Sequence, residues 1–145
     1  MFRCVALAAT VTFAITGHLF ADDAVQKEQA KFNGTWQLVS AEKDGKKTPE
    51  DVVKKIRVVI KDGKHTVYFG DDILAKDVQF TVDPTKTPKR VTDTLKDGQK
   101  INGIYELSGD TLKSCVAEAG KDFPTEFSAK EGTGQSLRVF KKVKK

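Results

Sequence analysis

Apolar and polar residues alternate with a period of two over much of the chain, which is the spacing of side chains on opposite faces of a β-strand. The first such run starts at Thr35, where Trp36, Leu38 and Ser40 share one face, and it ends at the turn Asp44-Gly45. Similar runs follow at residues 56–60, 65–69, 73–82, 90–95, 101–107, 111–117 and 136–143. The pattern therefore predicts an all-β chain of about eight strands.

The segments between these runs carry turn residues that predict antiparallel hairpins. Asp62-Gly63 and Asp97-Gly98 suit the positive φ angles that tight primed turns require. The two-proline segment 83–88 suits a corner and not the middle of a strand. Because long crossovers are few, we expect an antiparallel up-and-down β-barrel, with a β-sandwich as the alternative.

One short helix is predicted after the first strand. Thr48 can cap its N-terminus, Pro49 suits the first helical position, and Glu50 and Asp51 suit the positive end of the helix dipole. The apolar residues Val52, Val53 and Ile56 follow at helical spacing. We expect this helix to be the main crossover between two strands.

The first 21 residues have the features of a secretory signal peptide. Arg3 gives a positive charge, residues 5–17 are almost wholly apolar or small, and Ala21 precedes Asp22-Asp23. The apolar run is shorter than the ~20 residues of a spanning helix, so we expect cleavage and no remaining transmembrane anchor. The chain is then divided into a signal peptide (1–21), an N-terminal arm or short helix (22–31) and a barrel domain (32–143), exported to the periplasm or the extracellular space.

The net charge and the cysteine content exclude few classes of function. The chain has 25 Lys and Arg against 20 Asp and Glu, a formal net charge of +5 that falls to +4 when Arg3 leaves with the signal peptide. Because Cys4 also leaves, the mature chain keeps Cys115 alone, which excludes an intramolecular disulfide. We expect this thiol to be buried. The remaining length suits one domain.

Four segments together resemble a known family: GTWQLVSAEKDGK, DPTKTPKRVT, GIYELSGDTLKSC and PTEFSAKEGTGQSL. Gly34-Thr35-Trp36 looks like the G-x-W signature of lipocalins, and the wider pattern resembles a lipocalin-like domain family of unknown function that is abundant in planctomycete bacteria. The resemblance implies an exported lipocalin-like barrel whose tryptophan packs across the closed end. It also implies a basic residue of the last strand on the indole, for which Arg138 is the best match and Lys141 the second. It supplies no catalytic residue and no cofactor.

Residues that can carry chemistry are few and scattered. His65 is the only histidine of the mature chain, and we expect it at a strand end facing solvent, without the clustered ligands that a metal site needs. Cys115 and His65 lie on separate predicted strands, and the sequence alone does not show whether they meet as a nucleophile and base. We interpret Asp71-Asp72 as a solvated turn, Glu106 as an outward residue and Glu126 as unassigned. We therefore predict no enzyme activity.

The predicted barrel interior is the remaining clue to function, and the sequence does not decide whether it is hollow or filled. The interior ligand-binding residues that we predict are Leu38, Val58, Ile60, Val67, Phe69, Phe80, Tyr105 and Leu112, with Trp36 and Leu137 also facing inward. The first interpretation is a non-enzymatic binding module for a small apolar or amphipathic ligand. The alternative is a filled barrel that contacts an anionic envelope surface through the basic tail 141–145. The tail lacks the aromatic residues of a nucleic-acid site, and the oligomeric state stays open.

Overall fold

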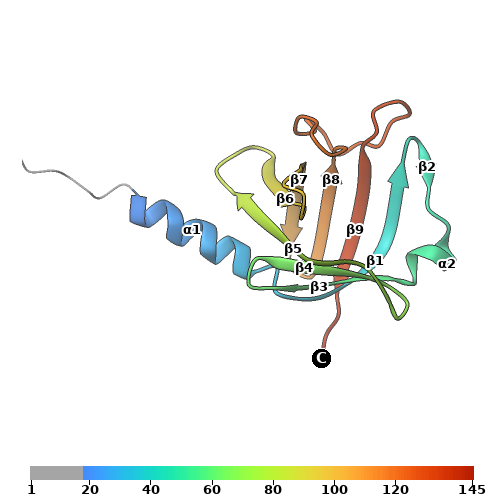
Figure 1. Cartoon of the computed structure of the whole chain (residues 1–145), viewed down its shortest axis with the longest axis horizontal. Helices are drawn as coiled ribbons and strands as arrows, with labels where there is room; N and C mark the ends of the chain where they lie inside the picture. Colours follow the sequence, from blue (N-terminus) through green and yellow to red (C-terminus); the bar gives the residue numbers. More distant parts are fainter. Residues whose placement is uncertain (1–17) are drawn as a thin grey trace, which may run out of the picture.

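The computed structural model describes residues 18–145, and eight long antiparallel strands close into a barrel in it (Figure 1). These strands are β1 (Gly34–Lys43), β3 (Ile56–Lys61), β4 (Lys64–Phe69), β5 (Asp72–Asp83), β6 (Lys89–Thr94), β7 (Lys100–Ser108), β8 (Thr111–Val116) and β9 (Ser136–Lys142). Each pairs with its neighbour in the chain, and β1 also pairs with β9, which closes the ring. The predicted barrel is confirmed, and the sandwich alternative is wrong.

The connection between β1 and β3 holds the short strand β2 (Lys46–Lys47) and the short helix α2 (Glu50–Val53), so the predicted helix after the first strand is confirmed. Its start differs by one residue, because Pro49 is the N-cap and no side chain caps the helix. Its C-terminal end is held instead. Gln37 of β1 donates from Nε2 to the carbonyl oxygens of Val53 at 3.2 Å and Ile56 at 2.9 Å.

The N-terminal helix α1 (His18–Ala30) projects from one side of the barrel in Figure 1. Most of the predicted signal peptide, residues 1–17, lies outside the described residues. The helix runs continuously across the expected cleavage position between Ala21 and Asp22. Between His18 and Lys145, no helix combines the length and the apolarity that crossing a membrane would require.

Helix α1 is attached to the barrel through a buried carboxylate. Glu28 is only 5% exposed and accepts hydrogen bonds from Lys89 Nζ at 2.8 Å, Tyr105 Oη at 3.0 Å and Lys31 Nζ at 2.8 Å. Burial alone would raise the pKa of this carboxyl, but the three hydrogen bonds outweigh burial and lower the pKa to about 2. The residues that join the arm to the barrel therefore include a full negative charge inside the protein.

Aromatic side chains close the barrel next to Glu28. The Trp36 indole donates from Nε1 to the carbonyl oxygen of Phe32 at 2.7 Å, which fixes the chain between α1 and β1. The Phe32 ring lies 5.0 Å from the Tyr105 ring and 5.7 Å from the Phe80 ring, between centroids. Because Trp36, Phe32 and Tyr105 are each at most 3% exposed, this end of the barrel is sealed.

The cation on the tryptophan is Lys142, so the prediction of Arg138 at this position, with Lys141 second, is wrong. Lys142 Nζ lies 5.3 Å from the Trp36 ring centroid. The register of β1 and β9 pairs Trp36 with Lys142, whereas Arg138 pairs with Ala41. Four residues of strand separate the two positions by about 13 Å, which places the guanidinium too far from the indole.

Gly34 of the G-x-W signature allows this contact. Its φ is +133°, and a Cβ built there would lie 2.7 Å from Cε of Lys142. Any side chain at Gly34 would therefore displace the lysine from the tryptophan face.

In β1 and in β9, some side chains lie on the opposite face of the sheet from the one that the sequence predicts. The β1–β9 register shifts between Leu38 and Ser40, so Ala41 packs against the core and Ser40 is exposed. On β9 the residues that line the interior are Arg138 and Phe140, and the predicted inward position of Leu137 is wrong. A bulge reverses the alternation downstream of it, and a long loop leaves the phase of the next strand undetermined.

Substitution of Glu28 by Gln tests the buried carboxylate. Because the folded-state pKa of about 2 lies below the ordinary 4.5, the ionised group stabilises the fold above pH 4.5, and this stability is lost as the pH falls toward 2. Gln resembles the protonated acid, so the variant should unfold with about 3 kcal/mol less free energy at pH 7. Urea unfolding of residues 22–145 between pH 2 and pH 7 measures the difference.

The control is Glu106→Gln, an exposed carboxylate on β7. This variant should follow the wild-type curve. Parallel pH curves for wild type and Glu28→Gln would contradict the assignment of the ionised form to Glu28.

Lys142→Met tests the corrected cation partner. Trp36 is the only tryptophan, so its fluorescence reports the contact directly. We expect the variant to shift the emission maximum and to cost about 1 kcal/mol of stability. Arg138→Met should leave the emission unchanged, and the reverse result would restore the original assignment.

Candidate ligand-binding site

A cavity of about 110 Å³ lies inside the barrel, lined mainly by apolar side chains. Six of the eight predicted interior residues line it: Val58, Ile60, Val67, Phe80, Tyr105 and Leu112. The other two lie elsewhere. Leu38 is buried in the core beside the cavity, and Phe69 lies at the end of β4, where Lys55 Nζ is 5.6 Å from its ring centroid. Most of the wall that would touch a ligand is therefore apolar.

Polar side chains also line this cavity, and His65 is one of them. Its Nε2 lies 3.1 Å from Oδ2 of Asp93, and the side chain is only 15% exposed. The expectation that His65 faces solvent at a strand end is wrong. The sequence already indicated the inward position of His65. His65 and Val67 are two residues apart on β4, so their side chains share a face. His65 Nδ1 is buried and has no hydrogen-bond partner within residues 18–145.

Arg138 lies where the cavity meets the open end of the barrel. A wider hollow of about 450 Å³ at this mouth shares Asp93, Val116 and Arg138 with the cavity, so the two are adjacent. Lys43 and Glu118 contribute one charge of each sign to its rim.

The Arg138 side chain is reachable by solvent from the mouth although protein surrounds it. Loss of water lowers the pKa of its guanidinium, and the nearby Asp93 carboxylate acts in the opposite direction. An arginine stays charged at neutral pH despite such a shift. Within residues 18–145 this guanidinium forms no ion pair and donates no hydrogen bond.

Sequence reasoning missed Asp93 and the inward position of Arg138. The signal for Asp93 was present, since it is two residues from Val91 on β6 and pairs with Phe80 of β5, and both neighbours line the cavity. For Arg138 the alternation with Phe140 was visible, but the absolute phase of β9 follows only from its pairing with β8 and β1.

Cys115 faces away from the cavity, which excludes the nucleophile and base pair with His65. Leu112, Ser114 and Val116 of β8 line the interior, so Cys115 points outward, where it is 0% exposed under the loop 117–135. Its Sγ donates to the carbonyl oxygen of Ser128 at 3.3 Å. Burial raises the pKa of the thiol, which opposes formation of a reactive thiolate. The predicted burial of this residue is confirmed.

The other candidate residues are separate from the cavity. Asp71-Asp72 lies at the β4–β5 turn and is exposed, as is Glu106. Glu126 accepts a 3.4 Å contact from Lys130 Nζ on the surface. Across residues 18–145, no group of three or more His, Cys, Asp or Glu side chains is placed to hold a metal ion.

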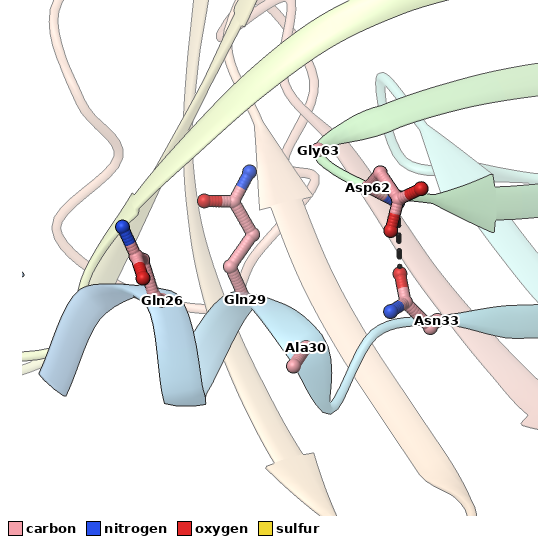
Figure 2. Close-up of a pocket in the computed structure, with 6 residues that line it drawn as sticks. All are labelled: Gln26, Gln29, Ala30, Asn33, Asp62 and Gly63. Carbon is pink, nitrogen blue, oxygen red and sulfur yellow. Dashed lines mark hydrogen bonds between the residues drawn. The ribbon is translucent and has the colours of Figure 1, made fainter. Parts of the chain in front are cut away.

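A second, polar pocket of about 250 Å³ lies between α1 and the β3–β4 turn (Figure 2). Gln26 and Gln29 extend from the helix toward the barrel there. Gln29 Nε2 donates to the carbonyl oxygen of Phe80 at 2.9 Å, and the Asp62 N–H donates to Asn33 Oδ1 at 3.1 Å. These hydrogen bonds hold α1 and the segment after it against the barrel. We therefore interpret this pocket as part of the contact between helix and barrel and not as a ligand site.

We compared the sequence with protein-family models and with curated protein sequences. No protein-family model matches the chain. No curated protein sequence matches it either. The chemistry of the site is therefore argued from the residues alone. A mainly apolar wall is suited to holding a small molecule that carries a polar end, since it lies beside a guanidinium and an imidazole nitrogen that have no partner among residues 18–145.

The thiol assignment can be measured directly. On folded residues 22–145, Cys115 should react with a disulfide reagent at pH 8 about 100-fold more slowly than an exposed thiol, because the reagent needs a thiolate that it can reach. The matched exposed thiol is Glu106→Cys in a Cys115→Ala background. Denaturation should release one reactive thiol per wild-type chain. Equal rates for the two folded proteins would show that loop 117–135 does not protect Cys115.

Proposed function

We propose that this chain is an exported, non-enzymatic binding module that takes a small apolar or amphipathic ligand through the open end of its barrel. The observation that carries the proposal is the mainly apolar cavity in the barrel, next to a mouth hollow of about 450 Å³ that shares three lining residues with it. Its resemblance to the lipocalin-like family of planctomycetes and the signal-like segment 1–21 support export to the periplasm or the extracellular space.

The shape of the barrel supports entry from one end only. Phe32, Trp36 and Glu28 are buried at the closed end, so a ligand has no route past them. Small-molecule sites usually have volumes of about 300–1,000 Å³, and the mouth hollow falls within this range. The ligand would lie in the mouth and insert its apolar part among residues such as Val67 and Phe80.

The size of the enclosed cavity favours a second candidate, the filled barrel that acts through its surface. Large rings such as Tyr105 occupy much of the interior and leave a cavity of about 110 Å³. This volume is small for a ligand site. The basic tail gives this candidate less support than its composition suggests. Lys142 is held by Trp36, and Lys144 Nζ lies 3.3 Å from Asp110 Oδ2.

A pair of neighbouring substitutions separates the two candidates. Val58 lines the cavity, whereas Val59 is adjacent on β3 and faces outward. Val58→Phe fills the cavity, so it should weaken binding of 1-alkanols about ten-fold or more, and Val59→Phe should not. NMR titration of residues 22–145 with butanol to decanol measures the affinities.

The filled barrel predicts no saturable shift with any alkanol, in wild type or in either variant. Equal weakening by Val58→Phe and Val59→Phe would place the binding outside the cavity. Thermal unfolding of each variant checks that the fold is kept, because an added ring in a packed interior can be destabilising.

A further inference from the structure

The guanidinium of Arg138 has donors that the described protein does not use. Arginine carries five N–H donors, and none of those on Arg138 is taken by an ion pair or hydrogen bond within residues 18–145. The side chain lies among both the cavity and the mouth residues, so these donors are reachable from solvent. A planar guanidinium in this state matches a carboxylate or phosphate through two parallel hydrogen bonds.

The one acid that lines the cavity is already engaged. Asp93 Oδ2 lies 3.1 Å from His65 Nε2, and among residues 18–145 no ion pair joins the Asp93 carboxylate to Arg138. Asp93 and Arg138 give the site one negative and one positive charge beside the imidazole. A ligand with one negative charge would be attracted to Arg138, whereas a doubly charged phosphate would place a second charge near Asp93 and be disfavoured.

The buried nitrogen of His65 is a second, independent indication of a ligand. Among residues 18–145 Nδ1 has no hydrogen-bond partner, and leaving a buried polar atom unsatisfied is unfavourable. Neutral imidazole can accept a hydrogen bond at this atom, and imidazolium can donate one. A polar ligand atom next to Arg138 is of the kind that would satisfy it.

The order of residues on β9 gives the orientation. Arg138 pairs with Ser114, and Phe140, two residues further from the mouth, pairs with Leu112. Two residues of strand span about 7 Å, so a group on Arg138 is followed by apolar walls in the direction of the closed end. A head group at Arg138 thus leaves space only for an apolar tail beyond it.

We propose that the ligand is a monocarboxylate with a short apolar chain, bound with its carboxylate on Arg138 and its chain toward Phe140 and Leu112. This rests on the proposed function, since it names the chemical class that the same site takes. The closed end limits the chain length.

The experiment compares hexanoate, 1-hexanol, hexylammonium and hexyl phosphate by isothermal titration calorimetry on residues 22–145 at pH 8, where the phosphate carries two negative charges. Hexanoate should bind about ten-fold or more tightly than each of the others, because hydrogen bonds to a charged group add more than neutral ones. Arg138→Gln should remove this preference and keep the affinity for 1-hexanol. The control is Arg57→Gln, whose guanidinium carbon lies 3.9 Å from the Tyr68 ring centroid on the outer face.

The results separate the carboxylate assignment from the proposed binding module. Binding of 1-hexanol, hexylammonium or hexyl phosphate that is as tight as that of hexanoate would overturn the carboxylate assignment and leave the binding module standing. An Arg138→Gln variant that keeps the hexanoate preference would do the same. Failure of all four probes and of the longer alkanols would overturn both. If Arg138→Gln does not fold, the wild-type order of the four probes decides alone.

Discussion

The pairing of the first and last barrel strands is the constraint on which the rest of the structure depends. The β1–β9 ladder closes the ring, and its register places Lys142 opposite Trp36 and Arg138 opposite Ala41. Closure also removes the exposed strand edges that an open sheet of this length would carry. The same register decides which β9 side chains face inward. The β1–β9 ladder therefore places Lys142 beside Trp36 at the closed end and Arg138 at the mouth.

The two ends of the barrel differ in kind. The closed end holds a buried carboxylate with three hydrogen-bond donors, a sealed indole and packed rings. The mouth holds a guanidinium without a partner among the described residues, and the cavity next to it holds an imidazole with one unused nitrogen. Polar groups at the closed end are therefore satisfied by the protein itself, and those toward the mouth are not. This asymmetry adds to the argument for a binding role that the cavity and the mouth hollow carry.

Much of the fold could be predicted because it depends on local patterns. Asp-Gly turns and period-two alternation located the strands, and they placed six interior residues such as Val58 and Phe80 on the cavity wall. The rest depends on contacts between distant parts of the chain. The facing of Leu137 and Arg138 follows from the β9 register, and the change of face after Leu38 follows from a bulge. His65 was an avoidable error, because alternation with Val67 already placed it inside.

The closing ladder also affects how the chain can fold. Trp36 belongs to the first barrel strand and Lys142 to the last, so this contact joins residues that are far apart in the chain. The ring cannot form until β9 has been synthesised, and until then β1 presents one unpaired edge. Long-range pairing of this kind slows folding, because the entropy of closing the loop is lost before the contacts form. The sealed indole should therefore be among the last parts of the molecule to reach its native surroundings.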